Sequence, residues 1–170
     1  MFTFFSQPEK FAYLSDGPVS CDICNVIEQC IDVSSAYSDD DTLQALCQQC
    51  IRTGKAAERG LEFNDTIDNG TDDFQIITTQ TPSLPTWQAL SWPLINGRYP
   101  VFDSIASKQS FRDETQFAEA CLDKPITEEL LHHLWEELPD KPIKHLNDAG
   151  HCSVYLFRLN GQSYWLWDAN

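Results

Sequence analysis

Two pairs of cysteines carry the spacing in this chain that could do chemistry. Cys21 and Cys24 form one C-x-x-C pair, and Cys47 and Cys50 form a second pair further along. Two intervening residues let a tight turn aim both sulfurs at one point ~2.3 Å from a metal ion, and two such pairs complete a tetrahedron. Four thiolates leave no open coordination position. The spacing therefore predicts one structural zinc ion that holds the fold together and does not activate water.

Two other interpretations of these cysteines stay open at this point. The pairs can be unrelated reduced thiols, or one of them can be a dithiol that is reversibly oxidised, as in a zinc or redox sensor. A thioredoxin-like dithiol lies in a βαβ unit, and no such pattern surrounds either pair. Cys30, Cys121 and Cys152 have no partner at ligand spacing, so we expect them to behave as small hydrophobic residues.

Composition limits the classes of protein to which the chain can belong. Its 170 residues are 42% hydrophobic and 12% aromatic, which is enough for one globular domain with a core. The 11 basic and 26 acidic residues give a net charge of −15, which argues against direct binding to nucleic acid or to an anionic membrane. Seven cysteines, with neither a basic leader nor a long apolar run, predict a soluble protein of the reducing cytoplasm.

Acidic residues gather in two segments of the chain. They can simply keep the surface hydrated and the protein soluble, or they can form a negative face that meets a basic partner. We predict the second role, because the net charge exceeds the magnitude of about 2 to 8 that is usual for small soluble domains. The predicted partner-binding residues are Asp39, Asp40, Asp41, Glu62, Asp65, Asp68, Asp72 and Asp73.

The first sixty residues are predicted to form the metal module. Residues 1–20 should be an extended lead-in, and residues 31–37 alternate as a short strand does. An acidic turn at 38–41 follows, and a helix over 42–59 should end at Gly60 and hold the second cysteine pair at or inside its start. A strand, a turn and a supported knuckle of this kind suit a zinc ribbon.

Residues 61–170 are predicted to be the α+β remainder of the same domain. The charged stretch 62–73 reads as a boundary loop, and 74–79 is β-branched enough for a strand, although it is too short to exclude a helix. Four further elements are predicted from apolar spacing, caps and turn signals: a short helix over 81–93 capped by Ser83, helices over 113–122 and from Thr127 onward, and a final β-hairpin. The fold class is therefore α+β, a single domain with a zinc-ribbon-like four-cysteine subregion and a C-terminal hairpin.

The histidines and tryptophans do not form a catalytic pattern in the sequence. His132 and His133 point roughly 100° apart on a helix, so they cannot chelate as an i, i+4 pair does. His145 or His151 together with Cys152 is the remaining combination for a hydrolase or transferase that uses zinc as a scaffold. The five tryptophans are expected mainly in the core, with a binding interface as the alternative. We predict that the protein is not an enzyme.

Several segments together resemble the CbrC family of small bacterial proteins, whose name associates it with colicin tolerance. The segments with this similarity run along most of the chain: the pair at 21–24, then 47–58 with its C-I-x-x-G-x-A-A pattern, then 63–65, 81–82, 87–92, 156–157 and 167–168. Many relatives carry a histidine and further cysteines where this chain reads 93–97 and 158–161, so no second metal site is expected here. The resemblance implies the fold, the cysteine cluster and a connection with bacteriocin resistance, but no reaction.

These observations combine into one expected function. We predict a non-catalytic, zinc-stabilised acidic binding protein, an immunity or tolerance factor that blocks a basic bacterial toxin such as a nuclease domain. Nucleases are basic because they bind phosphates, so an acidic inhibitor gains electrostatically steered association and competes for the charge that the substrate uses.

Overall fold

Two three-stranded antiparallel sheets organise the computed structural model, which describes residues 1–38 and 40–169. The first sheet has the order β1–β2–β3 and the second the order β4–β5–β6. The strands are β1 (Leu14–Ser20), β2 (Ile27–Asp32), β3 (Ala45–Leu46), β4 (Val101–Ile105), β5 (Cys152–Leu159) and β6 (Gln162–Ala169). The helices are α1 (Pro8–Phe11), α2 (Gln48–Arg52), α3 (Asp72–Thr79), α4 (Glu114–Ala120) and α5 (Glu128–Glu137). The α+β class predicted from the sequence is confirmed.

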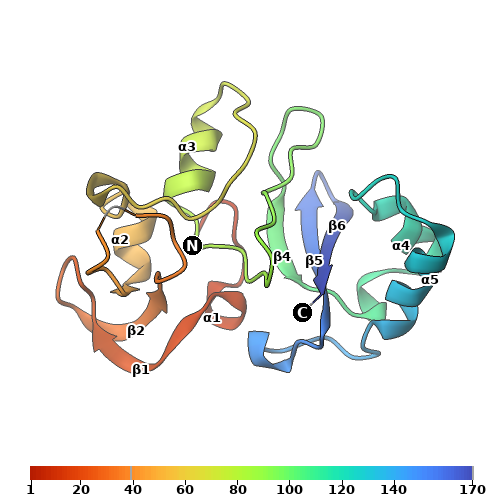
Figure 1. Ribbon diagram of the computed structural model, residues 1–170, viewed down its shortest axis with the longest axis horizontal. Coiled ribbons are helices and arrows are strands. Elements are labelled where there is room, and N and C mark those ends of the chain that lie inside the picture. Colours follow the sequence, from red (N-terminus) through yellow and green to blue (C-terminus); the bar gives the residue numbers. More distant parts are fainter. Residues whose placement is uncertain (39, 170) are drawn as a thin grey trace.

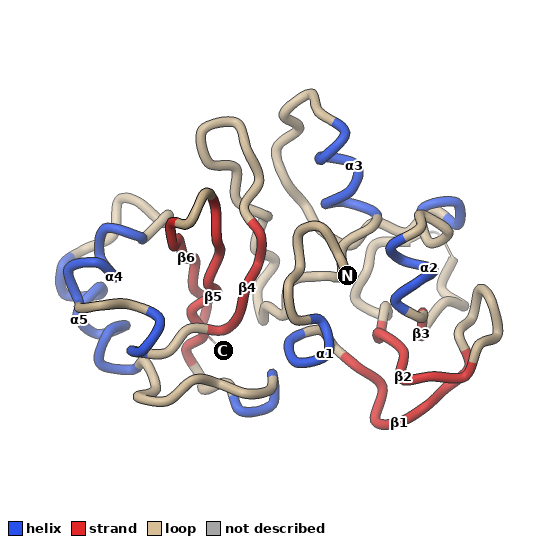
Figure 2. The backbone as a smooth tube through the Cα atoms, turned by 180° about the vertical axis from the view of Figure 1, so that it is seen from behind, coloured by secondary structure: helices blue, strands red, loops and turns tan. Residues whose placement is uncertain are grey.

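The two sheets lie in different halves of the molecule. Figure 1 shows β1, β2, α2 and α3 in one half, and β4, β5, β6, α4 and α5 in the other. The same division is seen from behind in Figure 2, where α4 and α5 cover the outer side of the second sheet. The N-terminal segment joins the halves, because Phe5 pairs in parallel with Phe102 of β4 and the Ser6 amide donates to the Phe102 carbonyl at 3.0 Å.

Strand β5 is buried on both faces, which explains its unbroken apolar sequence. Successive side chains of a strand point to opposite sides. Val154 and Leu156 pack into the cluster under α4 and α5, whereas Tyr155 and Phe157 pack into the large core that also contains the cysteine-rich half. The second sheet is thus the wall shared by two apolar layers, and the large core runs continuously from the cysteines to β5.

The C-terminal hairpin and the two helices before it form where local signals predict them. Asn160 and Gly161, between β5 and β6, have φ of 52° and 79°, as a type I′ turn requires. Helix α5 begins after Thr127, whose hydroxyl accepts a hydrogen bond from the Leu130 amide at 3.2 Å. Asp113 caps α4 in the same way through the Gln116 amide at 2.9 Å. These three predictions are confirmed.

The predicted strand over 31–37 is wrong in its position. The strand is β2, which ends at Asp32, because its partner β1 lies alongside residues 27–31. The Asp32 carboxylate then accepts the Ser34 amide at 2.9 Å and turns the chain away from the sheet. The lead-in over 1–20 is also more structured than expected, since it contains both α1 and β1.

Three helix and loop predictions need correction. The helix expected over 42–59 is broken into β3, α2 and a 3₁₀ turn, because Gly54 takes φ +79° and ends α2. Residues 74–79 belong to helix α3, which begins at Asp72 inside the expected loop. Residues 81–93 form no helix, and the Asn64 side chain instead binds the carbonyls of Thr81 and Pro82.

Candidate metal centre

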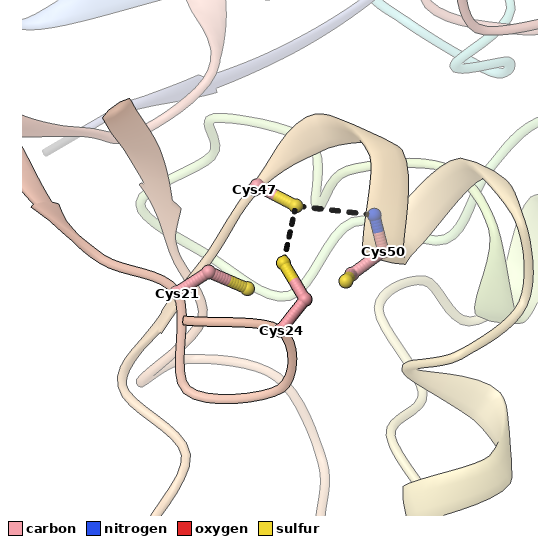
Figure 3. Close-up of side chains that lie close together, drawn as sticks. All are labelled: Cys21, Cys24, Cys47 and Cys50. Atoms are coloured by element: carbon pink, nitrogen blue, oxygen red, sulfur yellow. Dashed lines mark hydrogen bonds between the residues drawn. The ribbon is translucent and has the colours of Figure 1, made fainter. Parts of the chain in front are cut away.

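Four cysteine side chains converge beside the first sheet. The sulfurs of Cys21, Cys24, Cys47 and Cys50 all lie within 4.8 Å of one another, and Figure 3 shows them pointing toward a common centre. All four thiols are free. The structure thus brings together the two C-x-x-C pairs, as the sequence predicts, although strands β2 and β3 and the loop between them separate the pairs along the chain.

The first knuckle is the turn between β1 and β2. Cys21 follows the last residue of β1, and its amide donates to the Val26 carbonyl at 2.8 Å. The Asn25 amide donates back to the Cys21 carbonyl at 2.9 Å, and Asn25 takes a φ of 60°, which asparagine tolerates well. This closed turn places the Cys21 and Cys24 sulfurs on the same side.

The second knuckle is built on the start of helix α2. Cys47 is the residue before the helix, and its sulfur accepts a hydrogen bond from the Cys50 amide at 3.4 Å. Cys50 itself lies in the first turn, and its sulfur points into the cluster (Figure 3). The sequence-based prediction that this pair lies at or inside the start of a helix is confirmed.

A carboxylate clasps the two knuckles together. Asp22, inside the first pair, accepts hydrogen bonds from the amides of Gln44 at 2.7 Å and Ala45 at 2.8 Å. The Asp22 amide also donates to the Ala45 carbonyl at 3.0 Å. These three bonds fix the segment just before Cys47 against the turn that holds Cys21 and Cys24. No local pattern marks Asp22 as part of the site, because its partners lie more than twenty residues further along the chain.

The geometry and the donor set fit a tetrahedral metal ion. Sulfurs bound at ~2.3 Å around such an ion are separated by ~3.8 Å. The Cys24 and Cys47 sulfurs are 3.6 Å apart, far beyond the ~2.05 Å of a disulfide. Soft thiolates select zinc or iron rather than calcium or magnesium. The cluster could therefore hold one metal ion with four protein ligands.

Burial distinguishes one ligand from the other three. Cys21, Cys47 and Cys50 are at most 2% exposed, and they belong to the large core, whereas Cys24 lies at the surface. A centre that is part of the core contributes to the stability of the whole fold. The surface position of Cys24 gives a metal ion an entry path from the solvent.

The ionisation of the thiols shows what the cluster needs from a cation. Burial acts against the Cys21 thiolate, but hydrogen bonds from the backbone around Cys47, Cys24 and Ile23 outweigh it and lower the pKa of Cys21 to about 7. Burial raises the pKa of Cys47 and of Cys50, and the neighbouring thiols raise that of Cys50 further. Without a cation, burial therefore disfavours the thiolate forms of Cys47 and Cys50. A bound metal ion would stabilise all four thiolates.

The described acidic residues that are predicted to bind a partner lie on several segments of the cysteine-containing half, and their role in binding stays a prediction. Asp39 lies outside the described residues. Asp40 is already paired with Arg59 at 2.5 Å, and hydrogen bonds from Thr42 and then Arg59 lower its pKa. The other exposed members of the set lie on segment 62–68 and at the start of α3: Glu62, Asp65, Asp68, Asp72 and Asp73; Asp41 is exposed beside Asp40.

His145 and Cys152, one of the combinations that would favour an enzyme, lie in different surroundings. The clefts lined by His145 do not include Cys152. Cys152 packs against the apolar cluster under α5, where burial raises the pKa of its thiol. His132 pairs instead with Glu114 at 2.8 Å. That the protein is not an enzyme stays a prediction.

The tryptophans divide between core and surface. Trp92 and Trp165 are buried, and Trp135 and Trp167 are half-buried. Trp87 differs, because 60% of it is exposed. No local pattern distinguishes Trp87 from the other tryptophans. Asp168 of β6 holds its backbone, since the buried carboxylate accepts the Trp87 amide at 2.7 Å and the Gln88 amide at 3.2 Å.

Comparison with known proteins identifies a family whose activity is not established. The fold and the cysteine cluster define a small α+β protein with a candidate four-cysteine metal centre. A family model described as uncharacterised protein family UPF0167 matches residues 1–167, so the chain belongs to that family, which is also known as CbrC. Comparison with curated proteins and with solved structures gives no match. Within the described residues, no helix is both long and apolar enough to cross a membrane.

Proposed function

We propose that the protein is a non-catalytic, zinc-stabilised binding protein that blocks a basic partner. The observation that carries this proposal is the cluster of four cysteine sulfurs within 4.8 Å, three of them in the core. Four thiolates around zinc leave no position for a substrate or a reactive water, so the ion would act on folding alone. The fold held by the ion would present a rigid surface to which the basic partner docks.

The nature of the partner follows from charge. A net charge of −15 on 170 residues attracts basic proteins and speeds their association. A nuclease domain of a bacterial toxin has the required basic surface, because it binds phosphates. An inhibitor of such a toxin would work in the reducing cytoplasm, where the thiolate ligands stay reduced.

Two measurements on the purified protein test this proposal. Elemental analysis should find one zinc per chain, and iron in its place would contradict the identity of the metal. Binding to a panel of basic toxin nuclease domains should be detected by interferometry at low salt and should weaken steeply as salt is raised to ~0.5 M. Absence of binding across the panel, or binding that salt leaves unchanged, would contradict electrostatic blockade.

The alternative of a hydrolase or transferase rests on His145 or His151 acting with Cys152. A panel of ester and phosphate substrates, compared between the wild type and Cys152→Ser, separates this alternative from a binding protein. Turnover that is lost in Cys152→Ser would favour the enzyme.

A further inference from the structure

The surface cleft beside Trp87 combines an aromatic face with carboxylates. It has a volume of about 440 Å³ and is lined by Tyr13, by residues 32–35 at and after the end of β2, by segment 63–65 and by the loop 83–90. Trp87 stands at its edge with 60% of its surface exposed, and the buried residues Phe63 and Leu84 also contribute to the lining. Neither a lysine nor an arginine nor a histidine lines this cleft.

Two carboxylates in the cleft have no cationic partner within the part of the chain that the structure describes. Asp32 and Asp65 both line the cleft, and both are exposed. Asp32 accepts only a short local hydrogen bond from the Ser34 amide at 2.9 Å, and Asp65 accepts one from the Ser91 hydroxyl at 2.7 Å. By contrast, Asp40 and Asp103 elsewhere are paired with arginines of the same chain.

The backbone that carries Trp87 is firmly held, so the aromatic face is presented in a fixed place. Asp168 is 3% exposed and accepts the amides of Trp87 and Gln88. Its other carboxylate oxygen accepts the Tyr155 hydroxyl at 2.7 Å. On the other side of the loop, the Asn64 side chain accepts the Leu84 amide at 3.0 Å and donates to Thr81 and Pro82.

We infer that this cleft receives an arginine side chain from the basic partner, with the guanidinium stacked on Trp87 and facing Asp32 and Asp65. A planar guanidinium stacks on aromatic faces and binds carboxylates through several donors, whereas an ammonium is a compact and strongly hydrated charge. The inference rests on the proposed function, because it names the place where the basic partner docks. It adds Trp87 and Asp32 to the partner-binding residues predicted from the sequence.

The test begins with a probe that does not depend on the identity of the partner. The peptide acetyl-Gly-Arg-Gly-amide is titrated at constant ionic strength, and the indole N–H resonance of Trp87 is followed by NMR, assigned with Trp87→Phe. We expect a saturable shift with the arginine peptide, a weaker response with a lysine peptide and none with a glutamine peptide. Equal responses to arginine and lysine would overturn the stacked geometry, and no response to arginine would overturn the cleft as its site.

Matched variants separate the cleft from the overall charge. In the double variant Asp32→Asn with Asp65→Asn, each asparagine keeps one side-chain oxygen that can accept the local hydrogen bond. The variant should bind the arginine peptide about fivefold more weakly. Glu128→Gln with Glu129→Gln removes an equal number of negative charges from exposed positions on α5, and this control should leave the affinity for the peptide unchanged. Equal losses in the two double variants would overturn the inference.

A Trp87→Ala variant, compared with the α5 double variant, keeps this inference distinguishable from the proposed function. For any basic toxin domain that binds the wild type, Trp87→Ala should weaken binding about fivefold more than the α5 double variant does. A toxin domain that binds Trp87→Ala as tightly as the wild type would overturn the cleft while leaving the proposed function intact. Failure of every basic domain to bind the wild type would overturn the proposed function, and the peptide titration would still decide on the cleft.

Discussion

At the scale of single residues, the four cysteines differ in how much of the fold depends on them. Cys50 is 1% exposed, lies in the first turn of α2 and donates its amide to the sulfur of Cys47. It joins the metal centre to the large core. Cys24 offers a similar sulfur from the surface, where less packing depends on it.

Replacing Cys50 with serine should remove the metal and destabilise the protein. The hydroxyl is a poor substitute for a buried thiolate, and we expect a loss of about 3 kcal/mol or more in the free energy of unfolding. Zinc content by elemental analysis and urea unfolding followed by circular dichroism measure both effects. Cys152→Ser is the control. Because Cys152 lies outside the cluster, this variant should retain the zinc of the wild type. Full zinc content in Cys50→Ser would refute the role of Cys50 as a ligand.

The ion pair between Glu114 and His132 should make stability depend on pH. The hydrogen bond and charge of Glu114 raise the pKa of His132 above its ordinary value of 6.5. The folded state therefore binds the proton more tightly than the unfolded state does, so the stabilisation is complete below pH 6.5 and is lost as pH rises through the raised pKa.

Urea unfolding of the wild type and Glu114→Gln at pH 5.5 and pH 8.5 measures this effect. The difference in free energy of unfolding between the two proteins should be larger at pH 5.5, although it should be small because both side chains are exposed. The same difference at both pH values for Glu114→Gln would contradict the assignment.

At the scale of elements, local signals sufficed wherever the partner of an element is close in sequence. The hairpin at Asn160 and Gly161 needs only its own turn, and the caps Asp113 and Thr127 need only the next helical turn. Residues 81–93 do not have their partners close in sequence. Their polar groups are bound by Asn64 and by Asp168, which are distant in sequence, and the prolines at 82, 85 and 93 disfavour helix in the residues before them.

The same reasoning explains how much of the candidate site was predictable. The C-x-x-C spacing is a local signal, so the four cysteines could be grouped from the sequence. The cleft beside Trp87 is assembled from four separate stretches of the chain, at Tyr13, 32–35, 63–65 and 83–90, and Asp168 of β6 holds the backbone of Trp87. No periodicity within residues 83–90 reveals that placement.

The hairpin turn offers a direct test of local control. Gly161 has a φ of +79°, where a side chain is strained even though nothing lies within 4 Å of its Cβ position. Gly161→Ala should lower the free energy of unfolding by ~1–2 kcal/mol. Gly17→Ala is the matched control, because Gly17 has an ordinary φ and equally open surroundings. Urea unfolding compares the two, and equal stabilities would show that the turn does not require its glycine.

At the scale of the whole molecule, the large core connects the four-cysteine cluster to the distant sheet. Cys21, Cys47 and Cys50 belong to the same apolar cluster as Tyr155 and Phe157 of β5. Between them the ring of Phe102 lies against those of Phe5 and Phe157, with centroids 4.8 Å and 5.7 Å away. The sequence division at residue 60 therefore does not coincide with a gap in the packing.

Removal of the metal should consequently loosen more than the cysteine-rich half. Hydrogen exchange measured by mass spectrometry, with and without a chelator, should show faster exchange in β1 to β3 and also in β5, because β5 loses the support of the shared core. Helix α5 packs in the separate cluster with Phe117 and Trp165, whose rings stack with centroids 4.3 Å apart, so its exchange should change least. Unchanged exchange in β5 after complete removal of the metal would show instead that the two halves are stabilised independently.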